Sequence, residues 1–195
     1  MRNAAFLSVV LLVACAGSST LSTQYLLRAE PAERSGRVEA PVRVGLGRID
    51  VAPYLDQSGI VVETEAGQVQ AAREHQWAES LDAGLHSYLR AEMSAALGYD
   101  VSGSPADLAQ WDYTVEVYVD RLHGTMDGTA VLDASYRITP RAGAGDVAAY
   151  RFSRSAPLPR EGYPGLVDAE ADLVRQLAQA IAASLGEIGG DRPGT

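Results

Sequence analysis

The sequence predicts a single α/β domain behind an exported and lipidated N-terminus. The domain is expected to be a sandwich of two long amphipathic helices on a mixed, largely antiparallel sheet. Hydrophobic residues make up 47% of the 195 residues and charged residues 21%, which is the balance of a globular domain. Stretches of alternating apolar and polar residues predict strands, and two stretches with apolar residues three and four apart predict helices.

The first fifteen residues have the pattern of an export signal with a lipid attachment site. Arg2 gives a positive start, residues 4–13 are apolar, and Leu-Val-Ala-Cys at residues 12–15 matches a bacterial lipobox. The apolar run fits the ~7–15 residues of a signal sequence and is shorter than the ~20 that span a bilayer. An ordinary secretory signal with an incidental cysteine is the alternative. However, Cys15, the only cysteine of the chain, stands at the one position where lipidation needs a thiol.

This signal divides the chain into four predicted parts. Residues 1–14 are the signal peptide, 15–40 the lipidated cysteine and a flexible tether, 41–188 the folded domain, and 189–195 a disordered tail. The tether is rich in small and polar residues. Its exception is Tyr-Leu-Leu at residues 25–27, which is apolar enough to form a short strand or to dock on the domain.

Strands are expected at residues 42–51, 60–64, 68–71, 99–101, 113–120, 130–138 and 148–153. The first has a bulge near its glycines, the second and third form a hairpin, and the last three form an antiparallel meander. Helices are expected at residues 78–97 and 166–188, with a helical turn through Leu108. Gly98 is placed to end the first helix in a left-handed conformation. Three acidic residues near the positive N-terminal end of the second helix are expected to favour it: Asp168, Glu170 and Asp172.

Composition and motifs exclude several classes of function. The formal net charge is −9, so the chain repels phosphate backbones and nucleic acid is not an expected partner. One cysteine and three histidines are too few for a multi-cysteine metal site, and no hydrolase, nucleotide-binding or zinc-protease motif is present. No metal and no cofactor are expected. Trp77 and Trp111 are expected in the core, with partner contact as the alternative.

Several short stretches resemble the ABC-type transport auxiliary lipoproteins, the PqiC/YmbA family. The resemblance is densest over residues 42–98 and departs from the family at Ser80, where proline is usual, and at Glu63-Thr64, which replaces Thr-Arg. The matching stretches are Val44-Gly45-Leu46-Gly47, Pro53-Tyr54-Leu55-Asp56, Gly59-Ile60-Val61, Gln76-Trp77-Ala78-Glu79-Ser80-Leu81 and Ala95-Ala96-Leu97-Gly98.

The resemblance implies a fold like the N-terminal domain of TolB and a role without catalysis in an MCE/ABC-type lipid transport system. Members are expected to dock a periplasmic MCE-domain tunnel protein at the outer membrane and to form homo-oligomers. Ala16, which is not the aspartate of inner-membrane retention, also favours the outer membrane. The partner is expected to contact a sheet edge, the turn of Tyr54, Leu55 and Asp56, or Trp77.

If no helix covers the other face of the sheet, an exposed set on that face is a further candidate: Glu116, Tyr118, Asp120 and Arg137. Two other classes of function stay open. An envelope assembly factor or chaperone would not self-associate. A periplasmic hydrolase would place His86 or His123 beside a nucleophile in a cleft.

Overall fold

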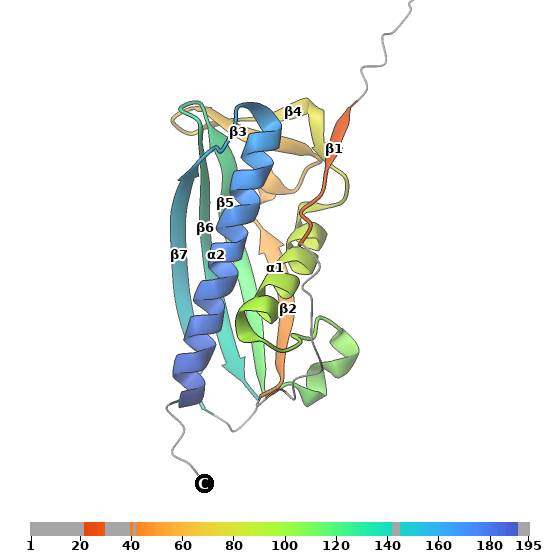
Figure 1. Ribbon diagram of the computed structural model, residues 1–195, viewed down its shortest axis with the longest axis vertical. Helices are drawn as coiled ribbons and strands as arrows, with labels where there is room; N and C mark the ends of the chain where they lie inside the picture. The colour runs from red at the N-terminus through yellow and green to blue at the C-terminus, as the bar shows by residue number, and fades with distance from the viewer. Residues whose placement is uncertain (1–21, 30–39, 41, 142–144, 191–195) are drawn as a thin grey trace, which may run out of the picture.

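The computed structural model describes residues 22–29, 40, 42–141 and 145–190, so the predicted signal peptide and Cys15 lie outside the described residues. Figure 1 shows one curved sheet with both long helices on the same face. The strands are β1 (Thr23–Tyr25), β2 (Val44–Val51), β3 (Gly59–Glu65), β4 (Gln68–Trp77), β5 (Tyr113–Thr125), β6 (Thr129–Pro140) and β7 (Ala148–Pro157). The helices are α1 (Leu81–Leu97) and α2 (Gly162–Gly190), with short 3-10 helices η1 (Pro53–Leu55) and η2 (Pro105–Gln110).

The sheet is mixed, which confirms the predicted fold class. Its order is β1-β4-β3-β5-β6-β7, and β2 also pairs with β5. The meander β5-β6-β7 and the hairpin β3-β4 are antiparallel, as predicted. β5 is long enough to hold two parallel neighbours, β2 beside its first part and β3 beside its end. The predicted bulge in the first strand lies between Leu46 and Ile49.

The apolar stripes of the two helices form the core against one face of the sheet. In α2, Leu173, Leu177 and Ile181 are fully buried. Gly98 ends α1 with φ 77°, the left-handed conformation predicted for it. α2 begins at Gly162 rather than at residue 166, because Pro164 lies in its first turn, where a missing N–H costs no helical hydrogen bond.

One predicted strand is absent, and the short apolar stretch of the predicted tether docks on the domain as expected. Residues 99–101 do not form a strand, because the N–H of Val101 is taken by the hydroxyl of Ser94 at 3.0 Å. Only Ser102 makes an isolated bridge to Gly45. Within the predicted tether, β1 pairs in parallel with the end of β4, and Leu27 is buried beside it. The apolar residues 25–27 therefore dock on the domain.

Candidate partner-binding surface

No described helix or strand covers the face of the sheet opposite the helices over β2, β5, β6 and β7 (Figure 1). Residues 115, 117 and 119 of β5 point into the core, so the residues between them point outward. Glu116, Tyr118, Asp120 and Arg137, the candidates named for an uncovered face, are all exposed. Tyr118 keeps 40% of its surface in solvent. We call this surface, together with Arg48, Asp50, Ser135 and Arg151, the open face.

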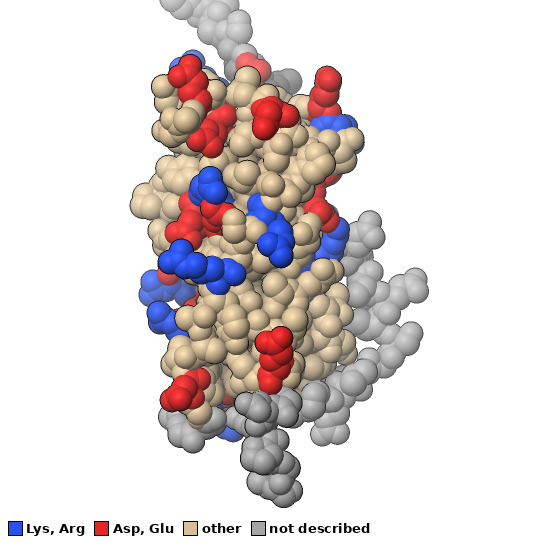
Figure 2. All heavy atoms as spheres, turned by 90° about the vertical axis from the view of Figure 1, so that its left-hand side faces the viewer, with Lys and Arg blue, Asp and Glu red and all other residues tan. Residues whose placement is uncertain are grey.

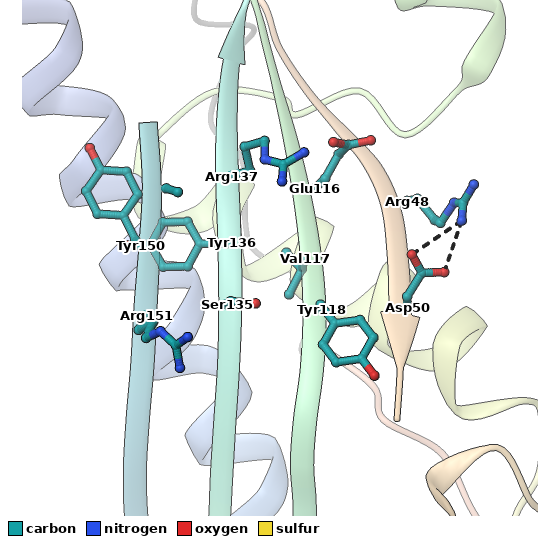
Figure 3. Close-up of a pocket in the computed structure, with 11 residues that line it drawn as sticks. Arg48, Asp50, Glu116, Val117, Tyr118, Ser135, Tyr136, Arg137, Tyr150 and Arg151 are labelled. Atoms are coloured by element: carbon teal, nitrogen blue, oxygen red, sulfur yellow. Dashed lines mark hydrogen bonds and ion pairs between the residues drawn. The ribbon is translucent and has the colours of Figure 1, made fainter. Parts of the chain in front are cut away.

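The open face holds a shallow hollow of about 720 Å³. Figure 3 shows that Arg137 reaches from β6 toward Glu116 on β5, and that Arg48 pairs with Asp50 on β2. The Arg48–Asp50 ion pair has an N–O distance of 3.4 Å. Ser135 and the ring of Tyr118 lie one row further along, beside Arg151 of β7. Arg137 and Arg151 therefore line one side of the hollow, and Glu116 with the Arg48–Asp50 pair lines the other.

Four charged side chains on this face make no ion pair or hydrogen bond within the described part of the chain. They are Glu116, Asp120, Arg137 and Arg151. By contrast, Asp133 is held by Arg121 and by the hydroxyl of Ser153 at 2.6 Å. Unpaired charges on an exposed surface keep their full capacity to bind a ligand of opposite charge. The open face is thus equipped for polar contact and not for burying an apolar ligand.

The turn predicted to bind a partner is tied into the fold by a buried histidine. The Tyr54 hydroxyl lies 3.0 Å from Nδ1 of His123, and Nε2 of His123 lies 3.4 Å from a Glu63 oxygen. Burial lowers the pKa of His123 in spite of the Glu63 carboxylate, so the imidazole stays neutral at neutral pH. Burial also raises the pKa of Tyr54 to about 12. The hydroxyl therefore remains protonated and acts as a structural link.

The four predicted partner-binding side chains do not share one surface. Leu55 is 1% exposed and Trp77 is 8% exposed, so both lie in the core. Tyr54 is partly buried on His123, and Asp56 is exposed. Trp77 pairs with Tyr25 of β1, and its backbone N–H donates to the carbonyl of Ser58 at 2.7 Å. Only Asp56 and the exposed part of Tyr54 are available to a partner.

Each of the three histidines contacts another group of the fold. His86 contacts the carbonyl of Leu46 at 3.2 Å, and His75 contacts the Tyr25 hydroxyl at 2.9 Å. His123 is 3% exposed, and its neighbour is a protonated tyrosine rather than an activated nucleophile. In the described ranges, no group of three His, Cys, Asp or Glu side chains could hold a metal ion. In the same ranges, no helix has the length and apolar character needed to cross a membrane.

Two features were missed by the sequence reasoning. Arg151 belongs to the open face, and the sequence carries a signal for it, because Arg151 alternates with the apolar residues 148, 150 and 152. Glu170, placed by the sequence near the N-terminal end of the second helix, is 1% exposed, with no hydrogen-bond partner for Oε2 in the described residues. Its burial was available from the helical spacing, because it lies one turn after Leu166 and one turn before Leu173 on the buried stripe.

Comparisons with known proteins agree with this architecture. The family model described as ABC-type transport auxiliary lipoprotein component matches residues 25–182. The chain is 27% identical over 142 residues to the intermembrane transport lipoprotein PqiC of Escherichia coli, covering 72% of this chain and 73% of that protein. The same values hold for PqiC of Shigella flexneri.

Two solved structures share the fold. An uncharacterized protein has a TM-score of 0.70 at 24% identity, covering 85% of this chain and 99% of the other. A protein from Xanthomonas campestris has a TM-score of 0.64 at 17% identity, covering 86% and 97%. At these identities the two structures support the arrangement of helices and strands alone.

Proposed function

Because the chain belongs to the family of ABC-type transport auxiliary lipoprotein components, we propose that it is a contact subunit of an envelope lipid transport system. In this proposal, acyl chains on Cys15 hold it at the outer membrane, facing the periplasm. Its partner is the periplasmic MCE-domain protein of the transporter, which it docks as a homo-oligomer. The chain makes and breaks no bonds in its substrate.

The open face is the observation that carries this proposal. A domain with helices on one face of its sheet could bury the other face in a second layer, yet here that face is polar and uncovered. Tyr118 and the unpaired charges Glu116, Arg137 and Arg151 give it the aromatic and arginine content typical of protein contacts. The exposed end of the Tyr54–Asp56 turn is the second contact point in the proposal.

β1 sets how far the domain can stand from the lipid. Thr23 follows Cys15 by eight positions, so it lies at most about 27 Å from an acylated Cys15 at an extended rise of roughly 3.4 Å per residue. β1 is held by its pairing with β4 and by the Tyr25–His75 contact, and Tyr163 stacks on that histidine with ring centres 4.1 Å apart. In this proposal the domain works close to the membrane that anchors it.

Membrane fractionation tests the anchor. At ~0.8 kcal/mol per buried methylene, two or three acyl chains give stable attachment. The wild-type protein is therefore expected in the outer-membrane fraction, and Cys15→Ala in the soluble or inner-membrane fractions with an unchanged circular dichroism spectrum. Ser18→Ala, three residues away, is the matched control and should fractionate like the wild type. Cys15→Ala protein that stays in the outer-membrane fraction and remains active would refute the proposal.

A further inference from the structure

Among the described strands, β7 lies at an edge of the sheet and pairs only with β6. The N–H of Leu158 donates to the carbonyl of Gly128 at 2.9 Å, which shows that Leu158 faces β6 with its backbone polar groups. In an antiparallel pair every second residue does so, and the even-numbered residues of β7 therefore hydrogen-bond to β6. The odd-numbered residues Ala149, Arg151, Ser153 and Ser155 therefore turn their N–H and C=O groups away from β6, toward the free edge.

This edge is open in the structure. None of the four outward N–H groups has a hydrogen-bond partner in the described part of the chain. Pro157 continues the odd-numbered series, and proline is tolerated at such a position because no ladder N–H is lost. The Ser153 carbonyl accepts a hydrogen bond from the Arg154 guanidinium at 2.9 Å. The four donors, with the carbonyls of Ala149, Arg151 and Ser155, thus form a template for one more strand.

The charge of the edge selects what can bind there. The charged residues of β7 are two arginines, Arg151 and Arg154, in a chain with a formal net charge of −9. Arg151 lies on the open face. Arg154 lies on the helix side, opposite Leu132, where its guanidinium rests over the ring of Phe152 at 5.6 Å. Figure 2, which looks at the molecule from the β7 side, shows several basic side chains at mid-height of this surface, with acidic side chains beside them.

A second copy of the chain is a poor occupant of this edge. Pairing two β7 strands would place arginines beside arginines, and like charges on neighbouring strands are unfavourable. An added strand with acidic residues three positions apart would instead place one carboxylate beside Arg151 and the other beside Arg154, on opposite faces.

We propose that the β7 edge takes up an extended acidic segment of a partner protein as an eighth strand. Main-chain hydrogen bonds to the odd-numbered residues supply affinity, and the two arginines select acidic side chains. This inference rests on the proposed contact function and names its docking mode. Arginines on an edge strand also prevent aggregation through edge-to-edge pairing. If that were their only role, the edge would show no preference for acidic peptides.

The probe is a short capped peptide of threonine and valine that carries two glutamates three positions apart. A second peptide with lysines in their place is its control. Each is titrated into the lipidated full chain in detergent while amide hydrogen exchange is followed residue by residue. The glutamate peptide is expected to slow the exchange of the amides of Ala149, Arg151, Ser153 and Ser155, and the lysine peptide is expected to have no effect.

Variants separate charge from backbone pairing. The double variant Arg151→Glu/Arg154→Glu should weaken binding of the glutamate peptide at least about tenfold and favour the lysine peptide. Arg73→Glu, a reversal of an exposed arginine on β4, is the matched control and should bind like the wild type. Ser153→Pro removes one outward N–H donor and leaves the backbone hydrogen bonds to β6 intact. It should weaken binding of the glutamate peptide to the wild-type background and of the lysine peptide to the double variant.

Three results would overturn the inference: equal binding of the two peptides, protection confined to other amides, or protection that rises with protein concentration without peptide. The last would assign the edge to a second copy. None of these results would affect the fractionation of Cys15→Ala, so failure here is distinct from failure of the membrane anchor.

Discussion

Replacing Glu170 with glutamine should make the fold more stable at neutral pH. Glu170 is 1% exposed on the core side of α2, and its Oε2 has no hydrogen-bond partner among the described residues. Burial raises its pKa from 4.5 to about 8. The folded protein therefore keeps this carboxyl protonated at neutral pH, whereas the unfolded chain ionises it.

The sign and size of the effect follow from linkage. A group whose pKa is raised in the folded state contributes most to the free energy of unfolding at pH values below its unfolded pKa. For Glu170 this contribution falls as the pH rises from 4.5 toward 8. Each pH unit in this window removes about 1.4 kcal/mol, so about 3 kcal/mol is lost by pH 7. Glu170→Gln keeps a neutral side chain of the same shape in both states and should escape this loss.

Urea unfolding of the mature chain with Cys15→Ala, with and without Glu170→Gln, measures the difference in the free energy of unfolding. The difference should grow by about 3 kcal/mol between pH 5 and pH 7. Glu187→Gln, on an exposed position of the same helix, is the control and should show a flat difference. If the difference in the free energy of unfolding for Glu170→Gln did not change with pH, the assignment of a buried carboxyl with a raised pKa would be refuted.

Three further substitutions test packing and a buried contact in the fold. Gly45→Ala should cost about 3 kcal/mol of unfolding free energy or more, because the new Cβ would stand 1.8 Å from Trp111. Gly47→Ala, whose Cβ would meet its nearest neighbour at 3.2 Å, should cost clearly less, and equal costs would contradict the packing. Tyr54→Phe should cost roughly 1–3 kcal/mol by leaving a buried imidazole nitrogen of His123 unsatisfied. An unchanged urea midpoint for Tyr54→Phe would contradict that contact.

Local patterns made much of the fold predictable. The alternation in β5, β6 and β7 set which side chains face the helices, so the exposure of Glu116 and Tyr118 followed once the helices lay on the opposite face. Gly98 could be assigned because a left-handed helix end favours glycine. These predictions depend on neighbours a few residues apart, which a sequence displays directly.

Long-range pairing was not readable from the sequence. Nothing local says that β2 and β3 share one edge of β5, or that β1 pairs in parallel with β4. The prediction of the partner-binding residues was incomplete for the same reason. Leu55 and Trp77 are apolar, and only the tertiary packing decides between core and partner contact. The burial of Glu170, by contrast, could be predicted from local spacing, because the residue lies on the apolar stripe of its helix. Only its place near the positive helix end was considered.

Site-specific photocrosslinking in living cells tests the central claim of contact through the open face. A benzophenone amino acid at Tyr118 samples that face, and the same amino acid at Gln179 samples the exposed side of α2. The account predicts a crosslink from Tyr118 to the MCE-domain protein and a much weaker one from Gln179. Crosslinks of equal strength at both positions, or a crosslink from Gln179 alone, would contradict it.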